Sequence, residues 1–171
     1  MARYTNKEFN EIINNYIIHP KFQQMKRFRH HGHSRYDHSL RVAYYTYKVT
    51  KALHLNYKQA TVAALLHDFF LDEVITEASI NRMRHHPKYA SINASKYFDI
   101  DYKQKSMIET HMFPVTIKPP IYIEGWLLDM VDDGVAIYEK VTSYQKGKMP
   151  IPKKRLNPLA SMFILFLTLF K

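Results

Sequence analysis

Cysteine is absent from this chain of 171 residues. Its absence excludes disulfides, thiolate zinc sites, iron–sulfur clusters and thiol nucleophiles, so any metal must be held by nitrogen and oxygen. Glycine is scarce as well, with 4 residues, and proline contributes only 8. This usage excludes collagen-like and low-complexity classes. The length predicts a single domain over residues 1–171.

The chain also lacks a hydrophobic run long enough to cross a membrane. Residues 159–170 carry no charge, but as a helix this run would span about 18 Å against a hydrocarbon core of roughly 30 Å. Residues 1–8 are polar and do not resemble an export signal. We therefore expect no transmembrane segment, a cytoplasmic location, and a C-terminal helix over residues 157–170 that completes the core.

Acidic residues are outnumbered by basic ones. Lys and Arg number 25 against 15 Asp and Glu, which gives a formal net charge of +10. Such a surplus favours anionic ligands, among them phosphorylated metabolites, nucleotides and nucleic acid. No helix-turn-helix, zinc-finger or RNA-recognition signature accompanies the charge. A small phosphorylated substrate is therefore the expected partner, and nucleic acid is an alternative.

No segment alternates cleanly enough to predict a strand, whereas helix signals recur along the chain. The first is the capping box Thr5-Asn6-Lys7-Glu8. Other helices are expected to begin near Pro20, Ser34, Asn56, Pro87, Asp101 and Ile121, the last running to about Ser143. The sequence therefore predicts an all-α fold, a single-domain bundle of about six or seven helices.

The segment over residues 60–66 is apolar nearly all round and ends in His67-Asp68. A helix of this kind is expected to be central and buried. A charged Asp and a His beside it would be costly to bury without partners. A metal ion is one such partner, because it takes neutral imidazole and ionised carboxylate together. The alternative is a helix end that emerges into solvent.

Further candidate metal ligands lie at helix ends or within an apolar helix segment. They are His38, His86, His111 and the group Asp129, Asp132 and Asp133. Buried carboxylates are expected only where they are paired or bind a metal. His85 could take the place of His86, which we prefer because Pro87 follows it. Helical spacing puts Asp129 on roughly the same face as Asp132 and Asp133, so periodicity does not decide among them.

The order His38, His67-Asp68, Asp132 resembles the HD superfamily of metal-dependent phosphohydrolases, named for its His-Asp pair. The resemblance covers residues from about 31 to 139 and is carried by residues 38–43, 63–68 and 126–132. Residues 86–87 and 111–114 resemble an uncharacterised bacterial subgroup. The resemblance implies a helical fold of the HD-domain type.

The resemblance also implies a binuclear site. His38, His67, Asp68 and Asp132 match the four core ligands, and His86 and His111 match the additional histidines of members with two metals. Asp68 would then bridge the two ions and act in catalysis, orienting a metal-activated hydroxide that attacks phosphorus. Divalent Fe, Mn, Zn, Ni and Mg all suit such ligands and are not distinguished. Only the family pattern favours Asp132 over its acidic neighbours.

Two departures from the family concern the substrate. Asp133 stands where many relatives have Lys, and Phe69-Phe70-Leu71 replaces the Ile-Gly-Lys of the cyclic di-GMP branch. The Gly-Tyr-Pro signature of that branch is absent too, so we expect another nucleotide or nucleotide-like metabolite. Arg35, Arg41 and Lys118 are candidate substrate-binding cations by their proximity to motif residues, and the alternative for each is a solvated surface charge.

Two other functions fit this resemblance. One is a non-catalytic module of HD fold that binds nucleic acid or nucleotides, which the net charge of +10 would suit. The other is a di-iron oxygenase, since a few relatives carry out oxidative chemistry. A homo-oligomer is an open alternative to a monomer.

Overall fold

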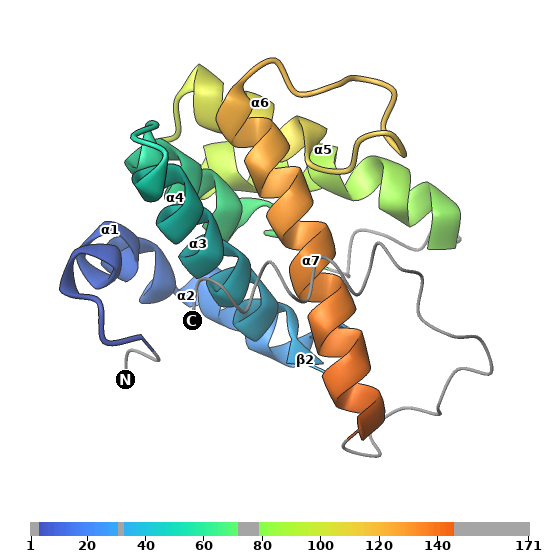
Figure 1. Cartoon of the computed structure of the whole chain (residues 1–171). Coiled ribbons are helices and arrows are strands. Elements are labelled where there is room, and N and C mark those ends of the chain that lie inside the picture. The colour runs from blue at the N-terminus through green and yellow to red at the C-terminus, as the bar shows by residue number, and fades with distance from the viewer. Residues whose placement is uncertain (1–3, 31–32, 72–78, 146–171) are drawn as a thin grey trace.

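The computed structural model describes residues 4–30, 33–71 and 79–145. Within these ranges it contains seven α-helices, a single-turn 3₁₀ helix and two short strands (Figure 1). In chain order they are α1 (Lys7–Ile17), α2 (Pro20–Gln23), the 3₁₀ helix Gln24–Arg27, β1 (Arg29–His30), β2 (His33–Ser34), α3 (Arg35–Ala52), α4 (Tyr57–Leu66), α5 (Ser79–Tyr97), α6 (Tyr102–Thr110) and α7 (Ile123–Gln145). The predicted all-α class is confirmed. The predicted helix over residues 157–170 lies outside the described residues.

Polar caps begin most of the predicted helices. Ser34, Asn56 and Asp101 accept hydrogen bonds from backbone N–H groups in the first turns of α3, α4 and α6. These bonds satisfy donors that a helix start leaves without an intrahelical partner. At α1 the cap is Asn6 rather than the predicted Thr5, and its side chain accepts from Phe9 N at 2.9 Å.

Two local predictions were wrong. The fifth helix begins at Ser79, so Pro87 lies inside it rather than in its first turn. Two-residue strands, β1 and β2, pair antiparallel through Arg29–Ser34 and His30–His33 where no strand was predicted. Strands this short contain too few residues for alternation to appear in the sequence.

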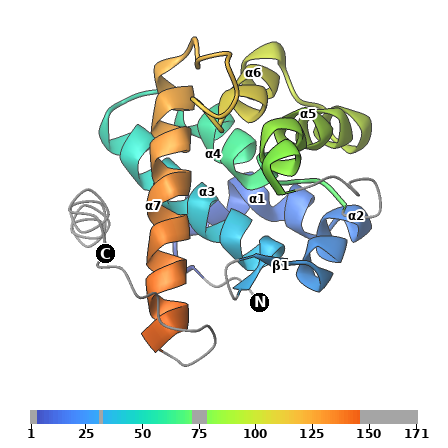
Figure 2. The ribbon, with the colours of Figure 1, turned by 90° about the vertical axis from the view of Figure 1, so that its right-hand side faces the viewer.

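Helix α4 lies at the centre of the bundle. Helix α3 packs along α4 and α7, and α6 packs against both α4 and α5. Figure 2 shows α7 running the height of the molecule beside α3, with α5 and α6 on the far side of α4. The C-terminal end of α4 therefore lies where α3, α5, α6 and α7 can all reach it.

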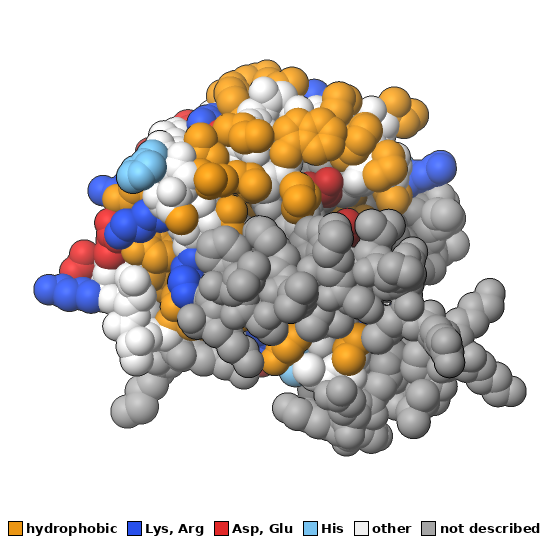
Figure 3. Space-filling view, viewed as in Figure 1, with side chains coloured by type: hydrophobic (Ala, Val, Ile, Leu, Met, Phe, Trp, Pro, Cys, Tyr) orange, Lys and Arg blue, Asp and Glu red, His pale blue; other side chains and the backbone are white. Residues whose placement is uncertain are grey.

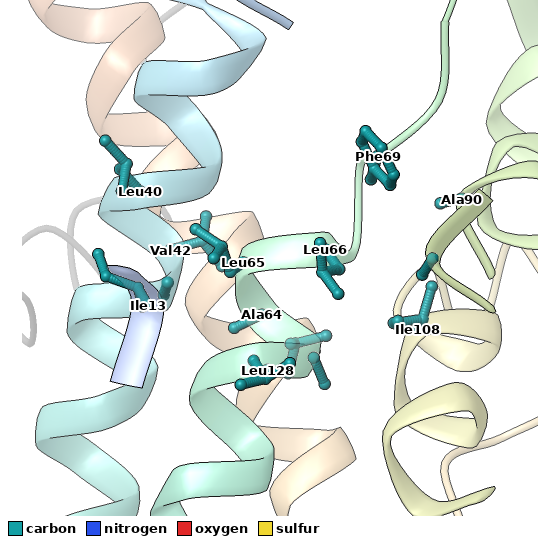
Figure 4. Close-up of a cluster of buried hydrophobic side chains, with 14 of the residues drawn as sticks. Ile13, Leu40, Val42, Ala64, Leu65, Leu66, Phe69, Ala90, Ile108 and Leu128 are labelled. Carbon is teal, nitrogen blue, oxygen red and sulfur yellow. The ribbon is translucent and has the colours of Figure 1, made fainter. Parts of the chain in front are cut away.

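The core is built around the apolar residues of α4. Leu65 and Leu66 are fully buried and belong to one hydrophobic cluster with Ile108 of α6 and Leu128 of α7, all labelled in Figure 4. Phe69, which follows α4, is also fully buried. Residues 60–66 of α4 are all buried, which confirms the prediction of a central helix.

The surface carries an apolar patch over α6, the loop after it and the first half of α7 (Figure 3). Its largest exposed members are Ile117, Ile121, Ile123, Trp126 and Met130. Ile123, Trp126 and Met130 share one face of α7 because they are spaced three and four residues apart. None of the helices in the described ranges combines the length and the hydropathy that a membrane span requires. A homo-oligomer stays an open alternative to a monomer.

Candidate metal centre

Two histidines occupy equivalent places at helix ends. His67 is the C-cap of α4 and His111 is the C-cap of α6. Each ring lies with Nδ1 at 2.7 Å from the backbone oxygen three residues earlier, Ala64 O and Ile108 O respectively. The last turn of a helix leaves its carbonyls without intrahelical donors, so Nδ1–H satisfies one of them. In each neutral ring Nε2 then carries the lone pair.

His38 reaches the same region from the first turn of α3. Its Nε2 lies 2.8 Å from Asp132 Oδ1 and its Nδ1 lies 2.9 Å from Glu139 Oε2. Both carboxylates come from α7, and the imidazole and Glu139 are buried. Asp132 Oδ1 also lies 3.4 Å from His67 Nε2, so this carboxylate stands between two imidazoles.

His86 of α5 completes the cluster on the opposite side. Its Nε2 lies 3.0 Å from His111 Nε2 and 3.2 Å from Asp68 Oδ1. The other carboxylate oxygen, Asp68 Oδ2, lies 3.9 Å from His67 Nε2. The two oxygens of Asp68 thus face different histidines. The Phe70 ring, with its centroid 5.2 Å from that of His86, covers this side.

The four imidazoles form a continuous row in the order His38, His67, His111, His86. Successive ring centroids are 5.5, 4.9 and 5.0 Å apart. Three overlapping sets of donor atoms each lie within 4.8 Å of one another, and these are His38–His67–Asp68, His67–His111–Asp132 and Asp68–His86–His111. Together they include every residue of the predicted ligand set.

The donor set fits a divalent cation. His67 Nε2 is buried and makes no hydrogen bond to any described residue, although its Nδ1 is held by a backbone carbonyl. Metal-binding histidines commonly have this arrangement: the ring N–H that faces away from the metal donates to a carbonyl or carboxylate, and that hydrogen bond fixes the tautomer. Neutral imidazole with carboxylate is a ligand combination that suits Zn, Fe, Mn and Ni.

Without a cation, the carboxylates hold positive charge on two imidazoles. Burial alone would lower the pKa of His38, but hydrogen bonds to Asp132 and Glu139 outweigh burial and raise it to about 10. Burial likewise opposes charge on His67, whose pKa is nevertheless raised by Asp132 and Asp68. The pKa of Asp132 is held well below its ordinary value, because His67 and His38 outweigh its burial. The metal-free cluster therefore stores protons that a cation would displace.

Other groups have pKa values shifted against ionisation. Burial, with the neighbouring His67 and His86, lowers the pKa of His111 to about 3. Burial, with the neighbouring carboxylates of Asp133 and Asp132, raises the pKa of Asp129 to about 8, and burial with Asp132 raises that of Asp133 to about 6. His111 is thus neutral at pH 7, as a metal ligand must be.

The predicted ligands and the alternatives to them have different surroundings. His86 is buried against the cluster, whereas His85 is exposed. Of the three candidate aspartates of α7, Asp132 is the one that contacts the imidazoles. Asp129 and Asp133 belong to none of the three donor sets found among the described residues.

The three predicted substrate-binding cations have different surroundings. Arg35 is buried, donates from Nη1 to Phe70 O at 2.7 Å and lies 3.8 Å from the Phe70 ring centroid. Arg41 forms an ion pair with Glu139. Lys118 is exposed in the loop between α6 and α7. Arg35 thus binds the residue that covers His86, and Arg41 binds the carboxylate that contacts His38. Contact of any of the three cations with substrate stays a prediction.

Sequence reasoning missed Glu139. Its signal was its spacing, since it lies seven residues after Asp132 and therefore on the same face of α7. Arg41 follows His38 by three residues and shares its face of α3 in the same way. Facing pairs of this kind become visible only once α3 and α7 are known to pack together.

Comparison with known families gives one match. The sequence family described as the HD domain matches residues 35–154. This match covers more than half of the chain and contains the whole cluster. No curated protein matches the chain, and no solved structure does.

Proposed function

Because the chain belongs to the HD-domain family, which lies within a superfamily of metal-dependent phosphohydrolases, we propose that it hydrolyses a phosphate ester with the help of two divalent metal ions. The observation that carries this proposal is the buried row of four imidazoles flanked by Asp68 and Asp132. Burial of so many ionisable groups costs free energy unless they are paired or bind a cation. A site of this composition is best explained by a metal.

We assign the ligands by the position of each donor atom. His38, His67, Asp68 and Asp132 would hold one ion, and His86 and His111 would complete the site of the second. Asp68 would bridge the two sites, because its Oδ1 faces His86 and its Oδ2 faces His67. The overlap of the three donor sets at His67, Asp68 and His111 also supports two adjacent ions.

When bound, such metals lower the pKa of water and neutralise the charge of a phosphoryl group. The chain's own residues hold and orient the reactants. Asp68 accepts a hydrogen bond from the attacking water and aligns it with phosphorus. Phe70 shields His86 from bulk water. We propose transfer directly to water without a covalent enzyme intermediate, since the clustered imidazoles and carboxylates are assigned as metal ligands.

The proposed substrate is a small phosphate ester, and a nucleotide or nucleotide-like metabolite in particular. The formal net charge of +10 supports an anionic substrate, because it raises the local concentration of anions. Lys118 is exposed, whereas Arg35 and Arg41 already bind groups of the protein. Lys118 is therefore the first of the three cations to test for a contribution to KM.

A phosphate-release assay tests the proposal. The protein is freed of metal, supplied separately with Mn²⁺, Fe²⁺, Zn²⁺, Ni²⁺ or Mg²⁺, and offered nucleotides and nitrophenyl phosphates. Hydrolysis should require the metal and should fall to background in Asp68→Asn. The matched control Asp99→Asn removes an exposed carboxylate and should retain full activity. Hydrolysis that persists without metal, or that survives in Asp68→Asn, would contradict the proposal.

A further inference from the structure

Three histidines of the cluster are fixed at Nδ1, but His38 is fixed in a different way from the other two. His67 and His111 sit at C-caps, where a backbone carbonyl of the last turn is available. His38 is the fourth residue of α3. Carbonyls at the start of a helix already accept from N–H groups of the following turn. Its Nδ1 therefore needs a partner from another element.

Glu139 of α7 supplies that partner. Its Oε2 lies 2.9 Å from His38 Nδ1, and the carboxylate is fully buried. An ionised carboxylate only accepts hydrogen bonds, so the contact places a proton on Nδ1. In a neutral ring Nε2 then carries the lone pair, on the side of the ring that faces Asp132. Asp132 and Glu139, two turns apart on α7, thus contact the two nitrogens of the His38 ring.

Arg41 balances the charge of Glu139. The Arg41 guanidinium donates from Nη1 to Glu139 Oε1, the oxygen that does not contact His38. A carboxylate buried this deeply is stable in its charged form only beside a cation and hydrogen-bond donors. Arg41 also lies over the Tyr138 ring, 5.8 Å from its centroid. The order of contacts is therefore Arg41, Glu139, His38.

We propose that Glu139 is a positioning residue for the metal centre, which orients His38 and raises its basicity as a ligand, and that Arg41 acts through Glu139. This inference rests on the proposed function, in which His38 binds a metal. Carboxylates behind ligating histidines affect metal affinity by about 10- to 100-fold in other sites. A loss of that size is expected here when Glu139 no longer accepts from Nδ1.

The test measures the affinity of metal-free protein for Zn²⁺ and Mn²⁺ by competition with a chromophoric chelator. Glu139→Gln should weaken binding by about 10- to 100-fold, because a neutral amide polarises the ring less. Glu139→Asp keeps the charge beside Arg41 but withdraws it from His38, and it should show a loss of similar size. Circular dichroism of each variant, with and without metal, reports whether it is folded. If Glu139→Gln does not fold, the metal affinity of Glu139→Asp provides the test.

Glu124→Gln is the matched control. Glu124 is on the same helix, is almost fully buried, accepts from Lys103 Nζ at 2.7 Å and also accepts from Asn56 N. It belongs to none of the donor sets found in the described ranges. Its replacement should lower the free energy of unfolding but leave metal affinity unchanged. The comparison therefore separates loss of a buried ion pair from loss of positioning.

Arg41→Gln tests the order of contacts. Alone it should weaken metal binding by less than Glu139→Gln does, and in the Glu139→Gln background it should add no further loss. Equal metal affinity in wild type, Glu139→Gln and Glu139→Asp would overturn the inference and leave the proposed function standing. Independent, additive losses would overturn the role of Arg41. A wild-type protein that binds no metal would overturn both the inference and the proposed function.

Discussion

Replacing Asp132 with Asn should destabilise the metal-free protein and weaken its metal binding. The side chain of Asp132 is 13% exposed, accepts from His38 Nε2 at 2.8 Å and lies 3.4 Å from His67 Nε2. His38 has a pKa raised to about 10, so the contact is an ion pair at neutral pH when no metal is bound. The Asn variant leaves a buried imidazolium with Glu139 as its remaining acid partner.

The size of the effect follows from the burial of the pair. Removing one partner of a buried ion pair costs about 3–5 kcal/mol, and because Glu139 remains we expect about 3 kcal/mol. For a chain of this length that loss corresponds to a decrease in Tm of about 6–12 °C. His38 has a folded pKa above its unfolded value, so its contribution is complete below about pH 6.5. The contribution is lost as the pH rises toward 10.

The assay is thermal unfolding followed by circular dichroism after metal removal, with metal content measured on parallel samples. Asp129→Asn and Asp133→Asn are matched controls on the same helix, and both should retain metal. The difference in Tm between wild type and Asp132→Asn should be largest near pH 6 and should shrink as the pH rises from about 6.5 to 10. Loss of metal in either control, with retention in Asp132→Asn, would refute the choice of Asp132.

Three further predictions concern stability. Phe69→Ala should cost about 3–5 kcal/mol in urea unfolding, because Phe69 is fully buried and its ring centroid lies 5.5 Å from that of Phe98; a cost below about 1 kcal/mol would contradict this packing. Burial raises the pKa of Asp129 to about 8, so the metal-free native state binds more protons than the unfolded state from about pH 4 to 8. The free energy of unfolding of the wild type should fall across that window relative to Asp129→Asn. If the two proteins show the same pH dependence of that free energy, the pKa of Asp129 is not raised. Hydrogen bonds from Lys51, Tyr47 and Tyr57 lower the pKa of Glu8 to about 2, so Glu8→Gln should lower stability above pH 4.5 and converge with wild type as the pH falls through 2; acid titrations of both proteins check this.

Local sequence signals predicted much of the helical framework. Ser34, Asn56 and Asp101 cap helices as predicted, because a cap depends on a few neighbouring residues. Pro87 was placed in a first turn, but α5 runs through it. A proline in the first turn loses no intrahelical hydrogen bond, whereas inside a helix it removes one that tertiary packing must offset. That packing cannot be predicted from the neighbouring sequence.

The candidate site likewise contains residues that local sequence predicts and residues that depend on how the helices pack. Residues at helix ends, such as His67 and His111, could be predicted because the end of each helix is visible in the sequence. Asp132 was favoured over its acidic neighbours by resemblance alone, since Asp129 lies on roughly the same helix face as Asp132 and as Asp133. The partners of Arg41 and Glu139 depend on how α3 packs against α7, which no local pattern records.

Metal content per chain tests the central claim most directly. Elemental analysis of purified wild-type protein, after supplementation with divalent metals, should find about two ions per chain. The Asp68→Ala variant, measured alongside it, should lose them while remaining folded by circular dichroism. About one ion per chain in the wild type would contradict the bridging assignment of Asp68. No bound metal under any supplementation would contradict the metal centre itself.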